Sequence, residues 1–519
     1  MIWNLESWQQ PCYNINNGRC VSLFKWKNSK NIIYEETTNN IIPFLSFIRP
    51  HSRAFHLSII LLITTFCVKY QSITFNTMKI FYYEDEHKDL NIKYESIYIY
   101  TGASISRIIF GFISDRIGIR LTYCIIIILS TLFGILNINY NYIILKLLTG
   151  ISSAGFVLSE LWVMTMFDVN ILGLVTGIIG GFGNFGMGLV ILINYSIISI
   201  FDIELLKYTI YWPYIIYILL IFPIYYMSDD CPYGNFIELK KKYIESLTDN
   251  NIEIDIESLT DNNIETDIET YIETDIENNI ENNIETDIEN VDLDITIRRR
   301  GSSQYDTMDN NINLENIISD ISYSKKNIYR VFKNIKIFSI SLTYLYSFGI
   351  EITLIINIQP YLNDIVYIDF KKTVNLLLIF SSINLIARPL GGYLCDKNYE
   401  KFKIIGKIKL ILLLILITSI MGIIFTYYFI NIKNKSYNTI LILLIFWSFF
   451  NNLLQGTIIG FIPHLDSSNM GVILGIVSSC GTIGGIIGNL LFIYYDIYSL
   501  IYINIFGIFI FVLNTFVLL

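Results

Sequence analysis

Long apolar stretches, separated by short polar segments, recur along most of this sequence. Each is about 18–25 residues long, the length that a helix needs to cross roughly 30 Å of hydrocarbon. We expect spans near residues 55–76, 94–113, 121–137, 141–166, 170–200, 208–228, 334–357, 372–395, 407–430, 437–463, 469–495 and 497–519. Six spans, a long polar gap and six further spans predict an all-α membrane protein made of two six-helix bundles.

The same pattern divides the chain into four parts. These are an N-terminal segment at 1–53, a first bundle at 54–228, a polar linker at 229–330 and a second bundle at 331–519. The linker repeats variants of "SLTDNNIE" and "NIETDIE", a low-complexity composition that cannot bury a core. We therefore expect a disordered or weakly helical acidic tether, with a segment that docks a partner as the alternative.

Composition agrees with a membrane protein. Of the 519 residues, 53% are hydrophobic and 16% are charged, and the mean hydropathy is +0.51. The net charge of −9 comes from the acidic linker and says little about partners. The seven cysteines and four histidines are scattered without metal-ligand or catalytic spacing, so we expect no enzyme, cofactor or metal. The predicted surroundings are the lipid bilayer, with no nucleic-acid partner and a monomeric state.

The distribution of lysine and arginine predicts the orientation. Basic residues gather before the first span, in the loop between spans 2 and 3, and in the loop between spans 8 and 9. Because such residues stay in the cytoplasm, both termini and the linker are expected there. The sequence leaves open whether the membrane is the plasma membrane or that of an organelle.

One motif occurs twice. "RIIFGFISDR" begins at Arg107 and "RPLGGYLCDK" begins at Arg388, so that the arginine, a glycine, an aspartate and a base each recur 281 residues later. A repeat across two six-span halves indicates two similar bundles related by an axis along the membrane normal.

The repeat also predicts the depth of the two arginines. Asp115 and Asp396 are expected at the cytoplasmic ends of spans 2 and 8, and each arginine lies eight residues earlier, or about 12 Å deeper. A charge near the midplane costs at least about 2.5–3.5 kcal/mol. An anion held between the two guanidinium groups would offset that cost. The alternative is that each arginine pairs with a carboxylate of its own bundle, Glu160 or Glu351.

Two spans are rich in glycine. Span 5 contains "GIIGGFGNFGMG" at 177–188, with Gly180 and Asn184, and span 11 contains "GTIGGIIGN" at 481–489, with Gly484. Glycines allow helix backbones to approach closely, which explains packing. The Asn184 amide needs a partner within the hydrocarbon, either a neighbouring helix or the anion.

These motifs resemble those of known transporters. Gly111, Asp115, Arg116 and Gly118 resemble the loop motif of the major facilitator superfamily. The segments "GASISRIIFGFISDRIGIR", "GLVTGIIGGFGNFGMG", "YSFGIEI" and "ARPLGGYLCDK" resemble the nitrate/nitrite porter family, most of all its eukaryotic high-affinity nitrate branch. The resemblance covers both halves but neither residues 1–45 nor the linker.

The resemblance implies the major facilitator fold and alternating-access, secondary active transport of a small monovalent anion, nitrate or nitrite, coupled to protons. The substrate-binding residues that it implies are Arg107, Arg388, Asn184, Gly180, Tyr344, Phe348 and Gly484. Two alternatives stay open. The substrate could be another small anion, such as a short carboxylate, or the protein could be a membrane sensor that binds the anion without transporting it.

Three residues depart from the family pattern. Ile486 stands where a second asparagine is usual, Lys69 lies within span 1, and Glu160 replaces a neutral amide. We expect Lys69 and Glu160 either to pair or to reach an outer vestibule. The sharper hypothesis is that they alter the anion site or carry a coupling proton.

Overall fold

The computed structural model describes residues 50–83, 89–140, 142–167, 170–200, 211–231, 235, 331–364, 370–431, 436–465 and 469–518. Nearly all of the N-terminal segment and the repeats of the linker lie outside these described residues. The tether hypothesis and the division of the chain into four parts therefore stay predictions.

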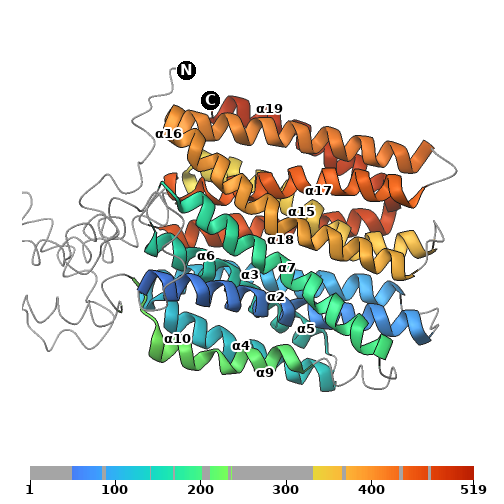
Figure 1. The fold of residues 1–519 in the computed structure, drawn as a ribbon, viewed down its shortest axis with the longest axis horizontal. Helices are drawn as coiled ribbons and strands as arrows, with labels where there is room; N and C mark the ends of the chain where they lie inside the picture. The colour runs from blue at the N-terminus through green and yellow to red at the C-terminus, as the bar shows by residue number, and fades with distance from the viewer. Residues whose placement is uncertain are drawn as a thin grey trace, which may run out of the picture.

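The first half is built from helices that alternate in direction (Figure 1). They are α2 (Pro50–Tyr83), α3 (Asp89–Ile117), α4 (Ile119–Tyr140), α5 (Ile143–Thr149), η4 (Gly150–Ala154), α6 (Gly155–Met166), α7 (Leu172–Ile200), α9 (Trp212–Leu219) and α10 (Ile221–Met227). The crossing expected at 141–166 is thus made of α5, η4 and α6 in succession, and the sixth crossing of α9 and α10.

The second half repeats this plan. It contains α15 (Ile335–Asp364), α16 (Phe370–Asn431), α17 (Tyr437–Ile459), η7 (Ile462–His464), α18 (Met470–Tyr495), η8 (Asp496–Tyr498) and α19 (Ser499–Leu518). At 62 residues, α16 is too long for a single crossing. Its backbone leaves helical geometry at Lys403 (φ 55°, ψ −145°), where the chain turns from the eighth crossing to the ninth.

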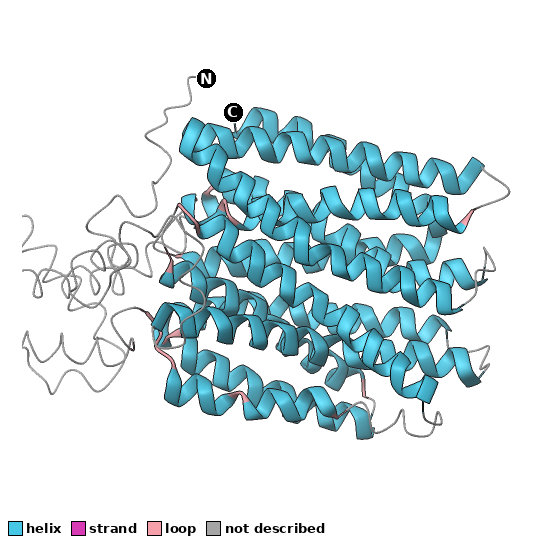
Figure 2. Cartoon of the chain, in the orientation of Figure 1, coloured by secondary structure: helices cyan, strands magenta, loops and turns pink. Residues whose placement is uncertain are grey.

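The described residues support the predicted number of spans. Nine stretches are long and apolar enough to cross a membrane, and a shorter apolar helix lies at Trp212–Met227. The stretches Lys371–Asn431 and Met470–Leu518 hold two crossings each, which brings the total to the expected twelve. Helices and short connections account for the described part of the chain, which contains no strand arrow in Figure 2.

The two halves lie side by side, with the first half in the lower part of Figure 1 and the second half in the upper part. Their main contacts are between α3 and α18 and between α7 and α16. Each of these pairs joins one helix that carries a repeated arginine motif, α3 or α16, to a glycine-rich helix of the other half, α18 or α7. The motifs therefore meet at the interface between the halves.

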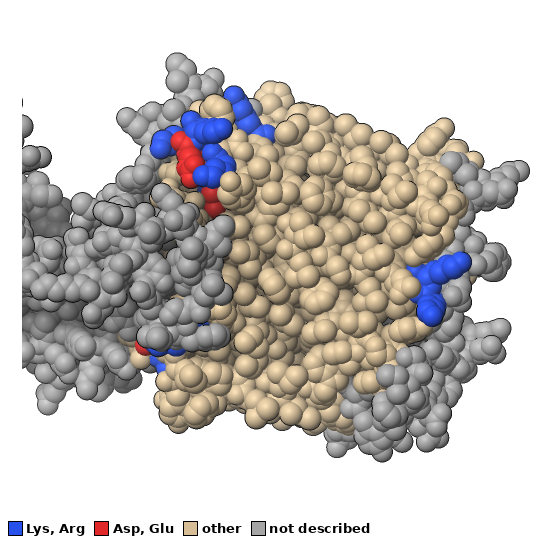
Figure 3. Space-filling model, in the orientation of Figure 1, with Lys and Arg blue, Asp and Glu red and all other residues tan. Residues whose placement is uncertain are grey.

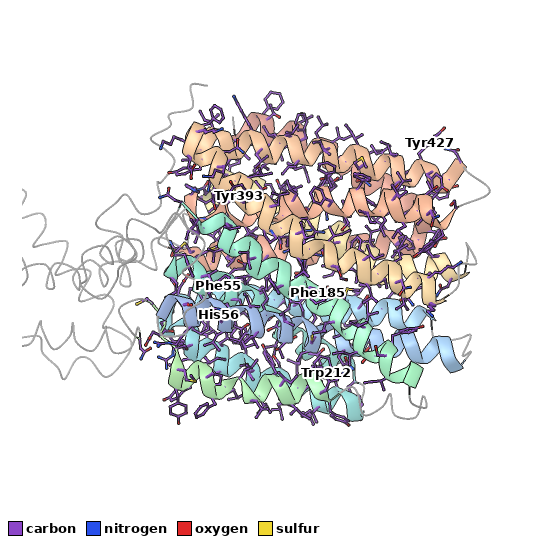
Figure 4. All side chains as sticks on the ribbon, viewed as in Figure 1. Phe55, His56, Phe185, Trp212, Tyr393 and Tyr427 are labelled. Atoms are coloured by element: carbon purple, nitrogen blue, oxygen red, sulfur yellow. The ribbon has the colours of Figure 1, made fainter. Side chains whose placement is uncertain are left out.

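The outer surface is apolar around the middle of the molecule. Figure 3 shows charged side chains near the two ends of the helices and a broad uncharged region between them. Many large apolar side chains of the helices are exposed, including Ile128, Ile386 and Phe516. In Figure 4 the aromatic side chains of Trp212 and Tyr427 lie toward the same end of the helices. An apolar middle with aromatic residues near an end is typical of a surface that faces lipid.

Candidate functional site

Arg107, on α3, is buried with 0% exposure. Its Nε donates to the carbonyl oxygen of Ser153 at 3.3 Å and to its hydroxyl at 3.1 Å, and its Nη1 donates to the carbonyl oxygen of Ser478 at 2.7 Å. The third nitrogen, Nη2, has no hydrogen-bond partner among the described residues. No ion pair to Arg107 occurs there either, so a buried cation keeps one donor free.

Arg388, on α16, is also buried, but a polar shell surrounds it. Its Nη2 lies 3.0 Å from Oε2 of Glu351 in an ion pair and also donates to Gln455. Its Nε donates to the side-chain oxygens of Asn384 at 2.9 Å and Asn452 at 3.4 Å. The alternative expectation of pairing within one bundle is therefore seen for Arg388 and not for Arg107.

The aromatic residue Phe348, on α15, lies beside both guanidinium groups. Its ring centroid is 5.4 Å from Cζ of Arg107 and 6.0 Å from Cζ of Arg388. Tyr344 stacks on this ring with the two ring centroids 5.4 Å apart, and its buried hydroxyl has no hydrogen-bond partner among the described residues. Phe156 covers Arg107 at 5.0 Å. The two predicted aromatic residues are thus next to the two predicted arginines.

Asn184, on α7, bridges the halves beside the ion pair. Its side-chain nitrogen lies 3.4 Å from both oxygens of Glu351 and from the side-chain oxygen of Asn384. If the amide is turned so that its oxygen faces Arg388, it accepts from Nε and Nη1 at 3.2 Å each. In either orientation the amide contacts the polar shell of Arg388, so a neighbouring helix supplies its partner.

Gly180 lies one turn from Asn184 and opens onto two charges. A methyl group at this position would lie 3.0 Å from Oε1 of Glu160 and 3.1 Å from Nη1 of Arg388. The two charged atoms therefore face the same small space, although they are too far apart to form an ion pair. Both oxygens of Glu160 are buried and have no hydrogen-bond partner among the described residues.

Lys69 was expected either to pair with Glu160 or to reach an outer vestibule, and both of these expectations are wrong. The side chain does not reach a vestibule, because it is only 3% exposed, and its Nζ has no hydrogen-bond partner in the described part of the chain. It does not pair with Glu160 either. Instead, Nζ lies over the rings of Tyr100 at 4.3 Å, Tyr70 at 5.1 Å and Phe66 at 5.6 Å. The reason is that Lys69 points toward α3, whereas Glu160 points toward α7 and α16.

Gly484 has a packing role. A methyl group there would lie 2.0 Å from the carbonyl oxygen of Leu345 and 3.2 Å from the Cα of Gly349, so α18 and α15 cross in backbone contact. A contact between Gly484 and an anion stays a prediction. Its neighbour Ile486, where the family pattern has asparagine, packs against the hydrophobic core instead.

The loop motif of the first half ties the halves together. Asp115, at the end of α3, accepts backbone hydrogen bonds from Gly471 at 3.3 Å and Val472 at 3.1 Å in the first turn of α18. A carboxylate at a helix N-terminus is favourable because the first amide groups there lack partners within the helix. Gly111 allows this approach, because a methyl group there would lie 2.4 Å from the carbonyl oxygen of Gly471.

The other two residues of this motif shape the turn after α3. Gly118 has φ of 93°, a left-handed conformation that side chains disfavour. Arg116 is exposed, and its guanidinium lies 4.1 Å from the ring centroid of Phe112. Both residues are outside the arginine cluster, as expected for a structural motif.

The second half makes the equivalent contact. Asp396 accepts backbone hydrogen bonds from Gly173 at 3.0 Å and Leu174 at 2.8 Å at the start of α7. Behind it, the fully buried Nζ of Lys407 lies 3.8 Å from Asp396 and 2.9 Å from Nε2 of His464. The sequence repeat therefore produces two matching contacts that hold the halves together at one end, eight residues from the arginines.

The buried ionisable groups form one electrostatic cluster. The positive charge of Arg107 repels those of Lys69 and Arg388, and the positive charge of Arg388 attracts the carboxylate of Glu160. With Glu351, the cluster contains three basic and two acidic side chains, all nearly inaccessible to solvent. If all five are ionised, one monovalent anion balances the remaining positive charge.

Several members of the site were missing from the sequence prediction. They are Ser153, Phe156, Asn384, Asn452, Gln455 and Ser478, together with the Lys69 cage residues Phe66, Tyr70 and Tyr100. A signal did exist for part of this set, because "NNLLQ" places three amides within the apolar tenth span and Asn384 precedes Arg388 by one helical turn. Carbonyl acceptors such as that of Ser478 carry no such signal.

Comparison with known proteins gives a family match. The sequence model described as "Major Facilitator Superfamily" matches residues 61–489. The chain is 24% identical to "High affinity nitrate transporter 2.7" of Arabidopsis thaliana, over 86% of this chain and 79% of the relative. It is 21% identical to "High-affinity nitrate transporter 2.3" of Oryza sativa subsp. japonica, over 76% of this chain and 63% of the relative. A match to "Nitrate transporter 2.2" of Chlamydomonas reinhardtii is 31% identical but covers 32% of each chain.

Solved structures share the fold. The proton:xylose symporter XylE aligns with a TM-score of 0.62 at 13% identity, covering 90% of this chain and 96% of XylE. The human organic anion transporter MFSD10 aligns with a TM-score of 0.53 at 11% identity, covering 91% of this chain and 100% of that one.

Proposed function

This chain belongs to the Major Facilitator Superfamily, and we propose that the substrate it transports is nitrate or nitrite. It is a multi-pass integral membrane protein with the all-α fold of that family, as predicted. The resemblance to the nitrate/nitrite porter family is also confirmed, because the curated relatives carry the names of nitrate transporters. The family is one of transporters, which supports the expectation that the chain is not an enzyme.

The observation that carries the proposal is the free donor of Arg107. This guanidinium is fully buried, and its Nη2 has neither a hydrogen-bond partner nor a carboxylate within reach among the described residues. A buried charge without a counter-charge is costly, so the position favours a ligand that brings negative charge. Arg388 approaches from the other half and shares the Phe348 ring with Arg107.

The chemistry of the lining favours a small, flat oxyanion. A guanidinium presents donors in a planar fork that suits a planar trigonal or bent anion. The rings of Phe348 and Phe156 lie beside the guanidinium of Arg107, which leaves the edge that carries Nη2 for the ligand. Tyr344 adds a hydroxyl that has no partner among the described residues. A short carboxylate such as acetate would also offer two oxygens, but its methyl group would need an apolar space of its own.

The contacts between the halves fit alternating access. Asp115 and Asp396 tie each half to the other at the end that the basic loops predict to be cytoplasmic. Release of these two helix-terminal contacts would let the halves rock about the arginine level and open the site to that side. Coupling to protons is part of the proposal, and Glu160 and Lys69 are two buried ionisable groups without a hydrogen-bond partner among the described residues that could serve it.

Uptake by purified protein in liposomes tests the proposal. We expect saturable uptake of isotope-labelled nitrate, competition by nitrite, and weak competition by formate, acetate and chloride. Stronger competition by formate or acetate than by nitrite would favour the carboxylate alternative. Nitrate binding without flux above that of protein-free liposomes would favour a sensor.

A further inference from the structure

We propose that Lys69 carries the coupling proton: its amine takes up a proton when the anion binds beside Arg107 and releases it when the anion leaves. The proposal rests on the proposed anion transport and names the side chain that would link it to a proton gradient.

The surroundings of Lys69 suit both of its protonation states. Nζ is held over the rings of Tyr100, Tyr70 and Phe66 at 4.3, 5.1 and 5.6 Å, which stabilises an ammonium by cation–π attraction. It has neither a hydrogen bond nor a carboxylate partner among the described residues, and burial in such surroundings favours a neutral amine. Because the two effects oppose each other, a modest change in nearby charge can decide between the two forms.

The nearby charge that can change is that of Arg107. The charged groups that act on Lys69 are Arg107 on α3, which opposes the ammonium, and Glu351 on α15, which favours it. The hydroxyl groups of Tyr70 and Tyr100 are hydrogen-bonded to each other at 3.3 Å. Glu351 is already paired with Arg388, whereas Arg107 has no counter-charge among the described residues. An anion at Arg107 therefore removes the main repulsion that the ammonium experiences.

A series of aromatic contacts connects the two cations. Phe66 lies next to Lys69, Phe156 lies 6.5 Å from Phe66, and Arg107 lies 5.0 Å from Phe156. Tyr100 precedes Arg107 by seven residues on α3, or about 10 Å along the helix. Because Nζ of Lys69 lies over the ring of Tyr100, this rise sets the scale of the distance between the two cations. A unit charge about 10 Å away, in an effective dielectric constant of about 20, changes proton affinity by roughly tenfold.

The coupling step adds only a proton to the amine of Lys69. The lone pair of the neutral amine forms one N–H bond with a proton from the side where the anion enters, and the same bond breaks on the side where the anion leaves. By linkage, the anion raises the affinity for the proton as much as the proton raises the affinity for the anion. Glu160 fits this role less well, because it faces Nη1 of Arg388, which already pairs with Glu351, so an anion beside Arg107 leaves its nearest charge unchanged.

The test compares Lys69→Arg, which fixes the positive charge, with Lys69→Met, which removes it. In liposomes, wild-type protein should accumulate nitrate against its gradient when the outside is acidic. Both variants should lose this accumulation and still exchange labelled for unlabelled nitrate at equal pH. Lys146→Met is the matched control. Nζ of Lys146 lies 3.6 Å from Oε2 of Glu95, outside the arginine cluster, so this variant should behave like the wild type.

A second variant tests the cage. Tyr100→Leu keeps the lysine but removes its nearest ring, so the pH at half-maximal uptake should move down by about one unit. A merely structural role for Lys69 would lower exchange and accumulation together and leave that pH unchanged. Acid-driven accumulation that persists in both Lys69 variants would overturn the proposal. If the wild type transports no nitrate at all, the proposed function itself fails.

Discussion

Replacement of Arg107 by lysine separates a charge requirement from a requirement for the guanidinium fork. Lysine keeps the positive charge, but its ammonium is one compact donor group and cannot reproduce a planar fork. In the structure, Nε and Nη1 of Arg107 are already committed to Ser153 and Ser478, while Nη2 is free. An ammonium that keeps these protein contacts has little left to offer an anion.

The expected loss follows from the number of donors removed. A hydrogen bond to a charged group contributes about 1.5–3 kcal/mol, so losing one should weaken nitrate binding roughly tenfold to a hundredfold. Titration calorimetry on purified protein measures the affinity, and liposome uptake measures the flux. Arg116→Lys is the matched control, because Arg116 lies on the same helix but is exposed. Nitrate affinity of Arg107→Lys within twofold of the wild type would refute the reasoning.

Four further substitutions test other parts of the account. Glu160→Gln removes a negative charge that faces Arg388, so it should tighten nitrate binding several-fold in calorimetry and leave acid-driven uptake in place. Loss of acid-driven uptake with nitrate exchange intact would instead assign the coupling proton to Glu160. Gly180→Ala should weaken nitrate binding without lowering the melting temperature much. Gly484→Ala should mainly lower the melting temperature, because the added methyl group would lie 2.0 Å from the carbonyl oxygen of Leu345. Equal effects of the two variants on both quantities would contradict the assigned roles. Asp396→Asn weakens the contact with α7 and should speed maleimide labelling of the buried neighbour Cys395, measured by mass spectrometry; an unchanged rate would show that the contact does not hold the halves together.

Much of the fold could be predicted from the hydrophobic pattern and the repeated motif of the sequence. Span length and spacing predict the twelve crossings, because hydrocarbon thickness limits helix length. The recurrence of the motif of Arg107 at Arg388 predicts two similar halves with two facing arginines. The turn at Lys403 lies in the basic loop predicted between spans 8 and 9, but the sequence carries no signal for the positive φ at Lys403 itself.

The site was predictable in its charged members and less so in their partners. Charge in an apolar span is conspicuous, so Arg107, Arg388, Lys69 and Glu160 stand out in the sequence. Which carboxylate reaches which arginine depends on helix rotation, and the sequence leaves Glu160 and Glu351 equivalent in this respect. The structure separates them, with Glu351 paired at 3.0 Å and Glu160 unpaired among the described residues.

The most direct test of the two-arginine anion site is the uptake of isotope-labelled nitrate by wild-type protein and by Arg107→Ala and Arg388→Ala in liposomes of equal protein content. The account predicts saturable uptake by the wild type and none above protein-free liposomes for either variant. Nitrate uptake at the wild-type rate by either variant would contradict the account, and so would the absence of nitrate uptake by the wild-type protein.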